Sequence, residues 1–161
     1  MGKKQHKSWQ EKLMDDKGLP KVVKITGKMS RRLGTGTVVI PASREVDEIM
    51  RKVPKGNVIT INRIREILAK RHGTTIGCPI ATGIFAWVAT NAAEEEAKEG
   101  EKDITPYWRT LKSNGELNAK YPGGVARQAR LLKAEGLTIE AGKGSKPPRV
   151  KDFEEHLADL K

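Results

Sequence analysis

The stretch from Ile104 to Gly136 constrains the fold most, because two glycine turns divide it into short pieces that end in a helix. The turns fall at 113–115 (Ser-Asn-Gly) and at 121–124 (Tyr-Pro-Gly-Gly). Apolar residues then recur at helical spacing, which leaves Arg127 and Arg130 free to face solvent or a polyanion. A loop of this kind can gather aromatic rings and an arginine around one pocket that suits a nucleobase and its phosphate: Tyr107, Trp108, Arg109 and Tyr121.

The same residues resemble the active-site segment of the O6-alkylguanine-DNA alkyltransferases. In that family Pro-Cys-His-Arg-Val precedes a Gly turn, a Tyr-x-Gly-Gly turn and a helix ending Leu-Leu-x-x-Glu-Gly. The matching segments here are 106–110, Gly115, 121–124 and 131–136. Tyr107 stands in place of the acceptor cysteine, and Trp108 in place of the histidine that helps to ionise it. A phenol with a pKa of about 10 is a poor alkyl acceptor at neutral pH.

The chain is therefore more similar to the alkyltransferase-like proteins, which lack the acceptor cysteine and bind alkylated guanine without repairing it. Those proteins keep the histidine that is Trp108 here. The resemblance begins near Ser43, because the DNA-binding domain of the family begins with a helix, a turn and a Thr-capped helix. The entry to the second helix has a Pro-x-Gly-x-Val-x-Thr pattern that residues 54–60 match. It implies a mainly α fold with short strands, a winged helix-turn-helix, alkyltransferase-like DNA-binding domain.

Three parts are expected: a basic N-terminal extension with a short helix and strands (1–40), the alkyltransferase-like domain (41–136), and a basic linker with a C-terminal helix (137–161). Helices are predicted over 7–17 with Ser8 as cap, from Ser43 as cap, from Thr60 as cap, over 79–98, and over 150–161. Strands are predicted over 21–26 and 35–40, separated by a basic turn over 27–32 that is either a phosphate clamp or an exposed loop without a specific ligand.

In helix-turn-helix order, the helix over 79–98 is the recognition helix. It carries no Lys or Arg before Lys98, whereas major-groove readers present Arg, Lys, Asn or Gln to base edges. Its small residues, expected to be exposed, permit close approach instead: Ala81, Thr82, Gly83, Ala86, Thr90 and Asn91. The resemblance implies a minor-groove position for this helix. It also places the intercalating arginine of the family on Thr82 and the tyrosine that helps to rotate the nucleotide on Ile61, so both identities are lost.

Two sets of candidate site residues follow. The base pocket is predicted to contain Tyr107, Trp108, Arg109, Tyr121 and Asn91. The DNA-binding set is Thr60, Ile61, Arg63, Ala81, Thr82, Gly83, Ala86, Gly123, Gly124 and Arg127. Core packing of Tyr107 against Trp108 and bracing of the turn by Arg109 are the alternatives to ligand contact. The resemblance assigns Glu135 to a structural network behind the active site, and Phe85 and Trp87 are expected in the core.

The charge favours a polyanionic partner, since the net charge is +11 and the pI is about 9.8. Residues 1–33 hold ten Lys or Arg against three acids. The acidic run over 94–103 is expected to face away from nucleic acid. Three scattered histidines offer no metal-ligand spacing, so neither metal nor cofactor is expected. Without an apolar run of about 18 residues or an apolar signal segment, a cytoplasmic or nucleoid-associated protein with no membrane partner is the default, and a monomer is expected.

The first functional hypothesis is a non-catalytic protein that binds double-stranded DNA, holds an extruded O6-alkylated guanine and marks it for a downstream repair protein. The second is a basic architectural or regulatory nucleic-acid binder without base flipping. The third is alkyl transfer to Cys78, the sole cysteine, whose place before Pro79 at a helix start could make it reactive; a small buried cysteine is the alternative. DNA against RNA stays open.

Overall fold

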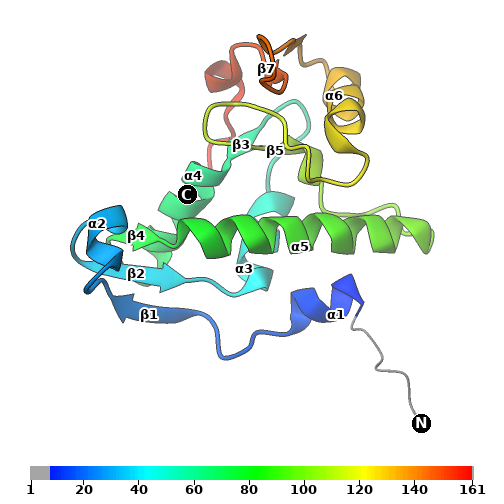
Figure 1. Ribbon diagram of the computed structural model, residues 1–161. Helices are drawn as coiled ribbons and strands as arrows, with labels where there is room; N and C mark the ends of the chain where they lie inside the picture. The colour runs from blue at the N-terminus through cyan, green and yellow to red at the C-terminus, as the bar shows by residue number, and fades with distance from the viewer. Residues whose placement is uncertain (1–7, 161) are drawn as a thin grey trace.

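The computed structural model describes residues 8–160, and a single long helix, α5 (Pro79–Lys98), runs through its centre (Figure 1). Pro79 occupies its first turn, where a missing backbone N–H costs nothing. One face of α5 is lined with small residues that let other helices approach closely: Ala86, Ala89, Ala92 and Ala93. The helices α1 (Trp9–Met14), α3 (Ser43–Arg51) and α4 (Ile61–His72) pack around it.

A three-stranded sheet lies beside the start of α5. Strand β1 (Lys21–Lys24) pairs antiparallel with β2 (Thr37–Ile40), and β2 pairs parallel with β4 (Ile76–Gly77). Both long strands were predicted. In β2 the consecutive residues Val38 and Val39 are both buried, so this strand is covered on both faces. The predicted basic turn between them holds a short helix, α2 (Met29–Leu33), at the tip of the hairpin.

Two parallel strands tie the segment after α5 to the start of α4. Strand β3 (Ile59–Thr60) pairs with β5 (Thr110–Leu111), which follows a 3-10 turn over Tyr107–Arg109. Thr60 caps α4 as predicted, since its hydroxyl accepts a hydrogen bond from the backbone N–H of Arg63 at 3.2 Å. Helix α6 (Gly124–Ala134) then packs beside the 3-10 turn.

Two local predictions about helix starts had different outcomes. The Ser8 hydroxyl caps α1 by accepting a hydrogen bond from the Glu11 N–H at 3.1 Å, as predicted. Ser43 was wrongly predicted as a cap, because it is the first helical residue of α3 and its hydroxyl donates to the Leu13 carbonyl at 2.6 Å. The side chain of Ser43 therefore connects α3 to α1.

The predicted basic linker and C-terminal helix are wrong. Strands β6 (Ile139–Glu140) and β7 (Arg149–Val150) form an antiparallel hairpin, followed by a 3-10 turn over Phe153–His156. Backbone groups of the main domain hold this segment, since Val150 N–H donates to the Gly115 carbonyl at 3.1 Å and Ala158 N–H to the Val58 carbonyl at 2.8 Å. The terminal apolar residues have helical spacing, but these long-range hydrogen bonds favour the hairpin and the 3-10 turn over a helix.

Charge is divided along α5. The hairpin of β1, α2 and β2 lies at the N-terminal end of this helix, and the acidic run over 94–103 lies at its C-terminal end (Figure 1). Part of the acidic run is structural, because the Glu95 carboxylate accepts hydrogen bonds from the Trp9 N–H at 3.0 Å and the Gln10 N–H at 3.2 Å. Among residues 8–160, no helix is long and apolar enough to cross a membrane.

Candidate nucleic-acid interface

The three aromatic rings of the predicted base pocket do lie together. The ring of Tyr107 meets Trp108 edge to face at 5.4 Å and Tyr121 at 5.9 Å. However, Tyr107 is only 1% exposed and Tyr121 only 3% exposed. These two rings fill the space between them and form part of the main core. Asn91 is on α5, where its side-chain amide donates to the Trp87 carbonyl at 2.9 Å.

The Tyr107 hydroxyl is hydrogen-bonded to a buried carboxylate, that of Glu94. It donates to Glu94 Oε1 at 2.5 Å, and Arg127 Nη2 lies 2.9 Å from the same oxygen. Burial, together with the hydrogen bond and negative charge of Glu94, raises the pKa of Tyr107 well above its ordinary value. Arg127 was wrongly expected to be free for a polyanion, because helix α6 turns it toward Glu94.

Arg109 braces the loop, which was the alternative to ligand contact. Its Nη2 lies 2.7 Å from Glu135 Oε2, and its Nη1 donates to the Val53 carbonyl at 2.7 Å. The Trp108 indole N–H also donates to Glu135, at 2.9 Å. Burial alone would raise the pKa of Glu135, yet hydrogen bonds from Arg109, Trp108 and the Gly56 N–H bring that pKa below its ordinary value. Glu135 is thus the ionised centre of a structural network, as the resemblance implied.

The exposed face of α5 differs from the predicted one. Thr82, Ala86 and Thr90 are buried, because this four-residue repeat falls on the side of the helix that packs against the core. The exposed side carries Ile80, Gly83, Ile84 and Trp87. Ala81 is half-buried. Trp87 was wrongly expected in the core: it is 38% exposed, and its indole N–H donates to the Lys120 carbonyl at 3.1 Å.

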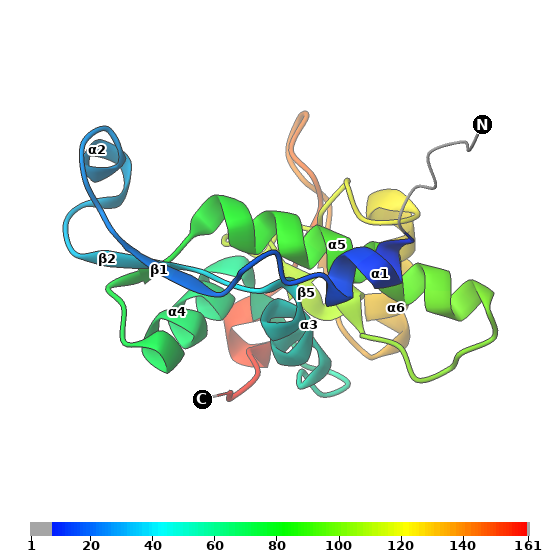
Figure 2. The same ribbon diagram turned by 90° about the horizontal axis from the view of Figure 1, so that it is seen from below.

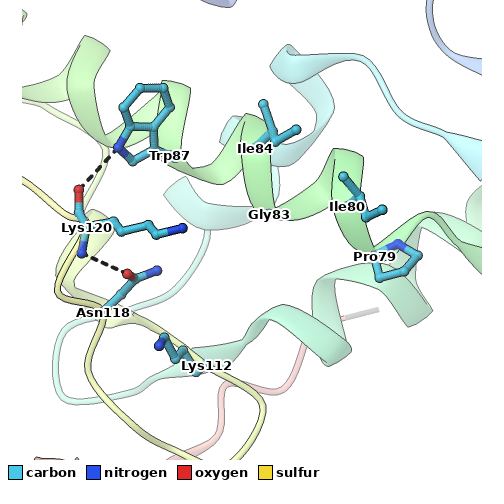
Figure 3. A pocket seen from close by; sticks show the side chains of 8 residues that line it. All are labelled: Pro79, Ile80, Gly83, Ile84, Trp87, Lys112, Asn118 and Lys120. Carbon is cyan, nitrogen blue, oxygen red and sulfur yellow. Dashed lines mark hydrogen bonds between the residues drawn. The ribbon is translucent and has the colours of Figure 1, made fainter. Parts of the chain in front are cut away.

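A groove of about 520 Å³ opens along this exposed face (Figure 3). Residues of α5 form one wall, and the segment 112–120 forms the other, with the side chains of Lys112, Asn118 and Lys120. No acidic residue lines it. Of the predicted DNA-binding residues only Gly83 lines this groove. The apolar residues at 80, 84 and 87 follow helical spacing and could have been recognised as a second, outward stripe.

The remaining predicted DNA-binding residues lie elsewhere. Thr60 is a buried helix cap, and Ile61 packs against the main core. Arg63 pairs with Glu66 at 3.1 Å. Gly123 precedes α6 and Gly124 is its first residue, with positive φ angles of 80° and 68° at this tight turn. A Cβ atom on Gly123 would meet the Arg127 side chain at 2.4 Å, so this glycine is required by packing.

Cys78, the third candidate reactive group, is half-buried at the N-terminal boundary of α5. Its backbone N–H donates to the Val39 carbonyl at 2.9 Å, which links α5 to strand β2. Among the described residues, no group of three or more His, Cys, Asp or Glu side chains could hold a metal ion.

No protein-family model and no curated protein sequence matches this chain. Among solved structures, it is similar to Atl1 of S. pombe in complex with damaged DNA containing O6-carboxymethylguanine. The two share 18% sequence identity with a TM-score of 0.50, and the match covers 73% of this chain and 94% of Atl1. A second structure, S. pombe ATL in complex with DNA, has 19% identity, the same coverage of 73% and 94%, and a TM-score of 0.46. The predicted fold class, mainly α with short strands and alkyltransferase-like, is confirmed.

Proposed function

We propose that this protein is a non-catalytic DNA-binding protein of the alkyltransferase-like type, which places the exposed face of α5 in the minor groove of duplex DNA. The observation that carries the proposal is the groove along α5. One wall is uncharged and apolar, with Gly83 beside Ile84, so it meets a nucleic-acid strand without repelling its phosphates. The opposite wall supplies Lys112 and Lys120, which can neutralise backbone phosphates.

The shared fold supports this proposal, since the Atl1 structure of the same architecture was solved with damaged DNA. The net charge of +11 adds a general attraction to polyanions. By analogy with the Atl1 complex, the proposed partner is duplex DNA. The proposal also takes a single copy of the chain as the binding unit and the cytoplasm or nucleoid as its location.

The environment of Tyr107 supports a binding role over an alkyl-transfer role. A nucleophile must be accessible and readily deprotonated. The Tyr107 hydroxyl is buried, its pKa is raised, and its proton is held by Glu94. Trp108 cannot act as a base, because the indole N–H only donates, and it is already bonded to Glu135.

A finer proposal is that the groove senses an extruded, O6-alkylated guanine and marks it for a repair protein. The groove is large enough for a nucleobase, and the exposed indole of Trp87 offers a surface for stacking. In this arrangement the base contacts Trp87 and Asn118, which both line the groove.

The test is a fluorescence anisotropy titration against two duplexes that differ in one guanine, plain or O6-methylated, at several salt concentrations. Binding at least tenfold tighter to the methylated duplex, about 1.4 kcal/mol, is expected if the groove reads a base. Equal affinity with a steep salt dependence would replace lesion sensing by architectural binding. Absence of duplex binding at low salt, or clear preference for duplex RNA, would overturn the DNA-binding proposal itself.

Two variants connect this test to the groove. Ile84→Glu places a negative charge on the exposed face of α5 and should weaken duplex binding at least tenfold, through repulsion of phosphates. Leu157→Glu is the matched control, because Leu157 is similarly exposed but lies outside the groove. Equal weakening by both substitutions would assign the DNA contact to another surface.

Alkyl transfer to Cys78 is tested directly by intact-mass measurement after incubation with O6-methylguanine DNA. The expected result is an unchanged mass. A 1:1 methyl adduct on Cys78 would show that the protein is an alkyltransferase and would contradict the non-catalytic assignment.

A further inference from the structure

The hairpin formed by β1, α2 and β2, called here the basic hairpin (residues 21–40), has an unbalanced charge. It contains no acidic residue, and its five cationic side chains are all exposed: Lys21, Lys24, Lys28, Arg31 and Arg32. None of the five forms an ion pair with another residue in the range 8–160. Their charges are therefore available to an external anion.

Arginines elsewhere in the described chain are mostly neutralised by acids. Pairs within 4 Å are Arg44–Asp16, Arg51–Asp47, Arg63–Glu66, Arg71–Glu45, Arg109–Glu135, Arg127–Glu94 and Arg149–Glu140. An arginine in such a pair must give up its internal partner before it binds a phosphate, whereas Arg31 and Arg32 have no acidic partner among residues 8–160. Guanidinium groups bind phosphate oxygens through two parallel hydrogen bonds, so these two side chains suit a nucleic-acid backbone.

The base of the basic hairpin is rigidly attached. Val38 and Val39 are buried, and β2 pairs with β4. The Thr37 N–H donates to Thr75 Oγ1 at 3.0 Å, and the Thr75 N–H donates to the Thr37 carbonyl at 3.1 Å. Gly36 fits closely here, since a Cβ atom at this position would lie 2.1 Å from Thr75 Oγ1. The hairpin is thus a fixed projection from the domain.

The direction of this projection matches the proposed DNA face. Figure 2 shows α2 at the N-terminal end of α5, standing out on the same side as the turn between β6 and β7. Pro79 and Ile80, the first residues of α5, line the groove at this end of the helix. A duplex seated along the exposed face of α5 and continuing past its N-terminus would meet the tip of the hairpin.

We propose that the basic hairpin is a second DNA-contacting arm, which binds backbone phosphates of the same duplex beyond the part contacted by α5. The inference rests on the proposed function, because it takes duplex DNA as the ligand. Lys28, Arg31 and Arg32 at the tip make these contacts, and they add affinity without sequence preference. The arm lengthens the bound site and increases the number of counterions released on binding.

The test compares two triple variants that remove the same charge. K28Q/R31Q/R32Q neutralises the tip, and K52Q/K55Q/K70Q is the control. The control lysines are exposed and lie in the turn after α3 and near the end of α4, on the side of α5 opposite to α2 (Figure 2). Because all six side chains are exposed, both variants should unfold at the same urea concentration as the unmodified protein.

Affinity for an unmodified 30-base-pair DNA duplex is measured by anisotropy between 50 and 200 mM salt. Removal of one phosphate-binding cation reduces the slope of log K against log salt by about 0.9, so the slope of the tip variant should be shallower by about 2.7. The ratio of the affinity of the unmodified protein to that of the tip variant should then fall about 40-fold between the lowest and the highest salt concentration. The control variant should keep the slope of the unmodified protein within about 0.9.

The outcomes separate the two proposals. Equal slopes for the tip and control variants, in a protein that does bind the duplex, would overturn the arm and leave the α5 groove as the DNA site. Failure of the unmodified protein to bind duplex DNA at 50 mM salt would overturn the proposed function. A shallower slope in the tip variant alone supports the arm.

Discussion

Among single residues, Glu135 stabilises the loop that contains Trp108 and Arg109. Its carboxylate binds the Arg109 guanidinium, the Trp108 indole N–H and the Gly56 N–H. The side chains of Arg109 and Glu135 are only 13% and 8% exposed, so this ion pair is poorly screened by water. Loss of the Glu135 charge would leave the buried Arg109 guanidinium without an anionic partner, beside the Val53 carbonyl and the Trp108 ring.

Glu135→Gln should therefore lower the free energy of unfolding by about 3 kcal/mol at pH 7, as measured by urea titration. Because the folded-state pKa of Glu135 is lowered, its stabilising charge is fully present above the ordinary value of 4.5 and is lost as the pH falls through the folded-state pKa. The difference between the unmodified protein and the variant should shrink from pH 7 to pH 3. Glu66→Gln, at an exposed ion pair, should cost less than about 1 kcal/mol. A Glu135→Gln difference that stays constant with pH would contradict the assigned charge.

The role of some residues in this loop could be predicted from the sequence, whereas the burial of others could not. The structural role of Glu135 followed from its place in the motif, whereas Arg109 was assigned to the base pocket and bracing was only the alternative. The burial of Tyr107 and Tyr121 did not, because an aromatic ring suits a base pocket and a core equally well. That choice depends on Glu94, whose position beside the Tyr107 hydroxyl is created by the packing of α5 against the loop.

Among the helices, α5 has two apolar faces that differ in side-chain size and in exposure to solvent. The inner face is built from alanines, and the outer face from Ile80, Ile84 and Trp87. The bounds of α5 were predictable from Pro79 at its start and the charged run at its end. The identity of the buried face was not, since both faces repeat with helical spacing and only the packing of α1, α3 and α4 selects between them.

Gly83 on the outer face gives a prediction that separates stability from binding. A Cβ atom at this position would meet no other atom within 4 Å, and glycine inside a helix is about 1 kcal/mol less favourable than alanine. Gly83→Ala should therefore raise the free energy of unfolding by about 0.5 to 1 kcal/mol, as measured by urea titration.

Larger side chains at position 83 should instead obstruct the groove. Gly83→Gln tests bulk alone, and Gly83→Glu adds charge, so anisotropy should rank DNA affinity as unmodified above Gln above Glu. Unchanged affinity in both variants would mean that the strand does not approach this face of α5.

At the scale of the whole molecule, the C-terminal segment completes the second core cluster. Val150 is fully buried beside Leu111, Leu117 and Leu132, which belong to the preceding domain. The sequence suggested a linker here because glycine, lysine and proline dominate residues 142–149. Its hairpin pairs with backbone at residues 115 and 117, and the segment after the hairpin pairs with residue 58; no local pattern reveals these contacts.

Truncation after Gly136 should consequently lower the free energy of unfolding by at least about 4 kcal/mol, because it exposes apolar surface in that cluster. Val150→Ala should cost about 2 kcal/mol for the same reason, whereas the exposed Leu157→Ala should cost less than about 1 kcal/mol. Urea unfolding of the three variants measures these differences. A truncated chain as stable as the full one would restore the interpretation of residues 137–161 as a linker.

The division of charge along α5 also affects how the molecule approaches a partner. Within residues 8–160, the cations of the basic hairpin lie at one end of the helix and the acidic run at the other, so this part of the chain carries an electric dipole in addition to the net positive charge. The helix macrodipole has the same sense, with its positive end beside the hairpin. In the field of a polyanion such a molecule experiences a torque that turns its cationic end forward. Its rotational diffusion is therefore biased before any contact forms, and a larger fraction of collisions begins at the hairpin end.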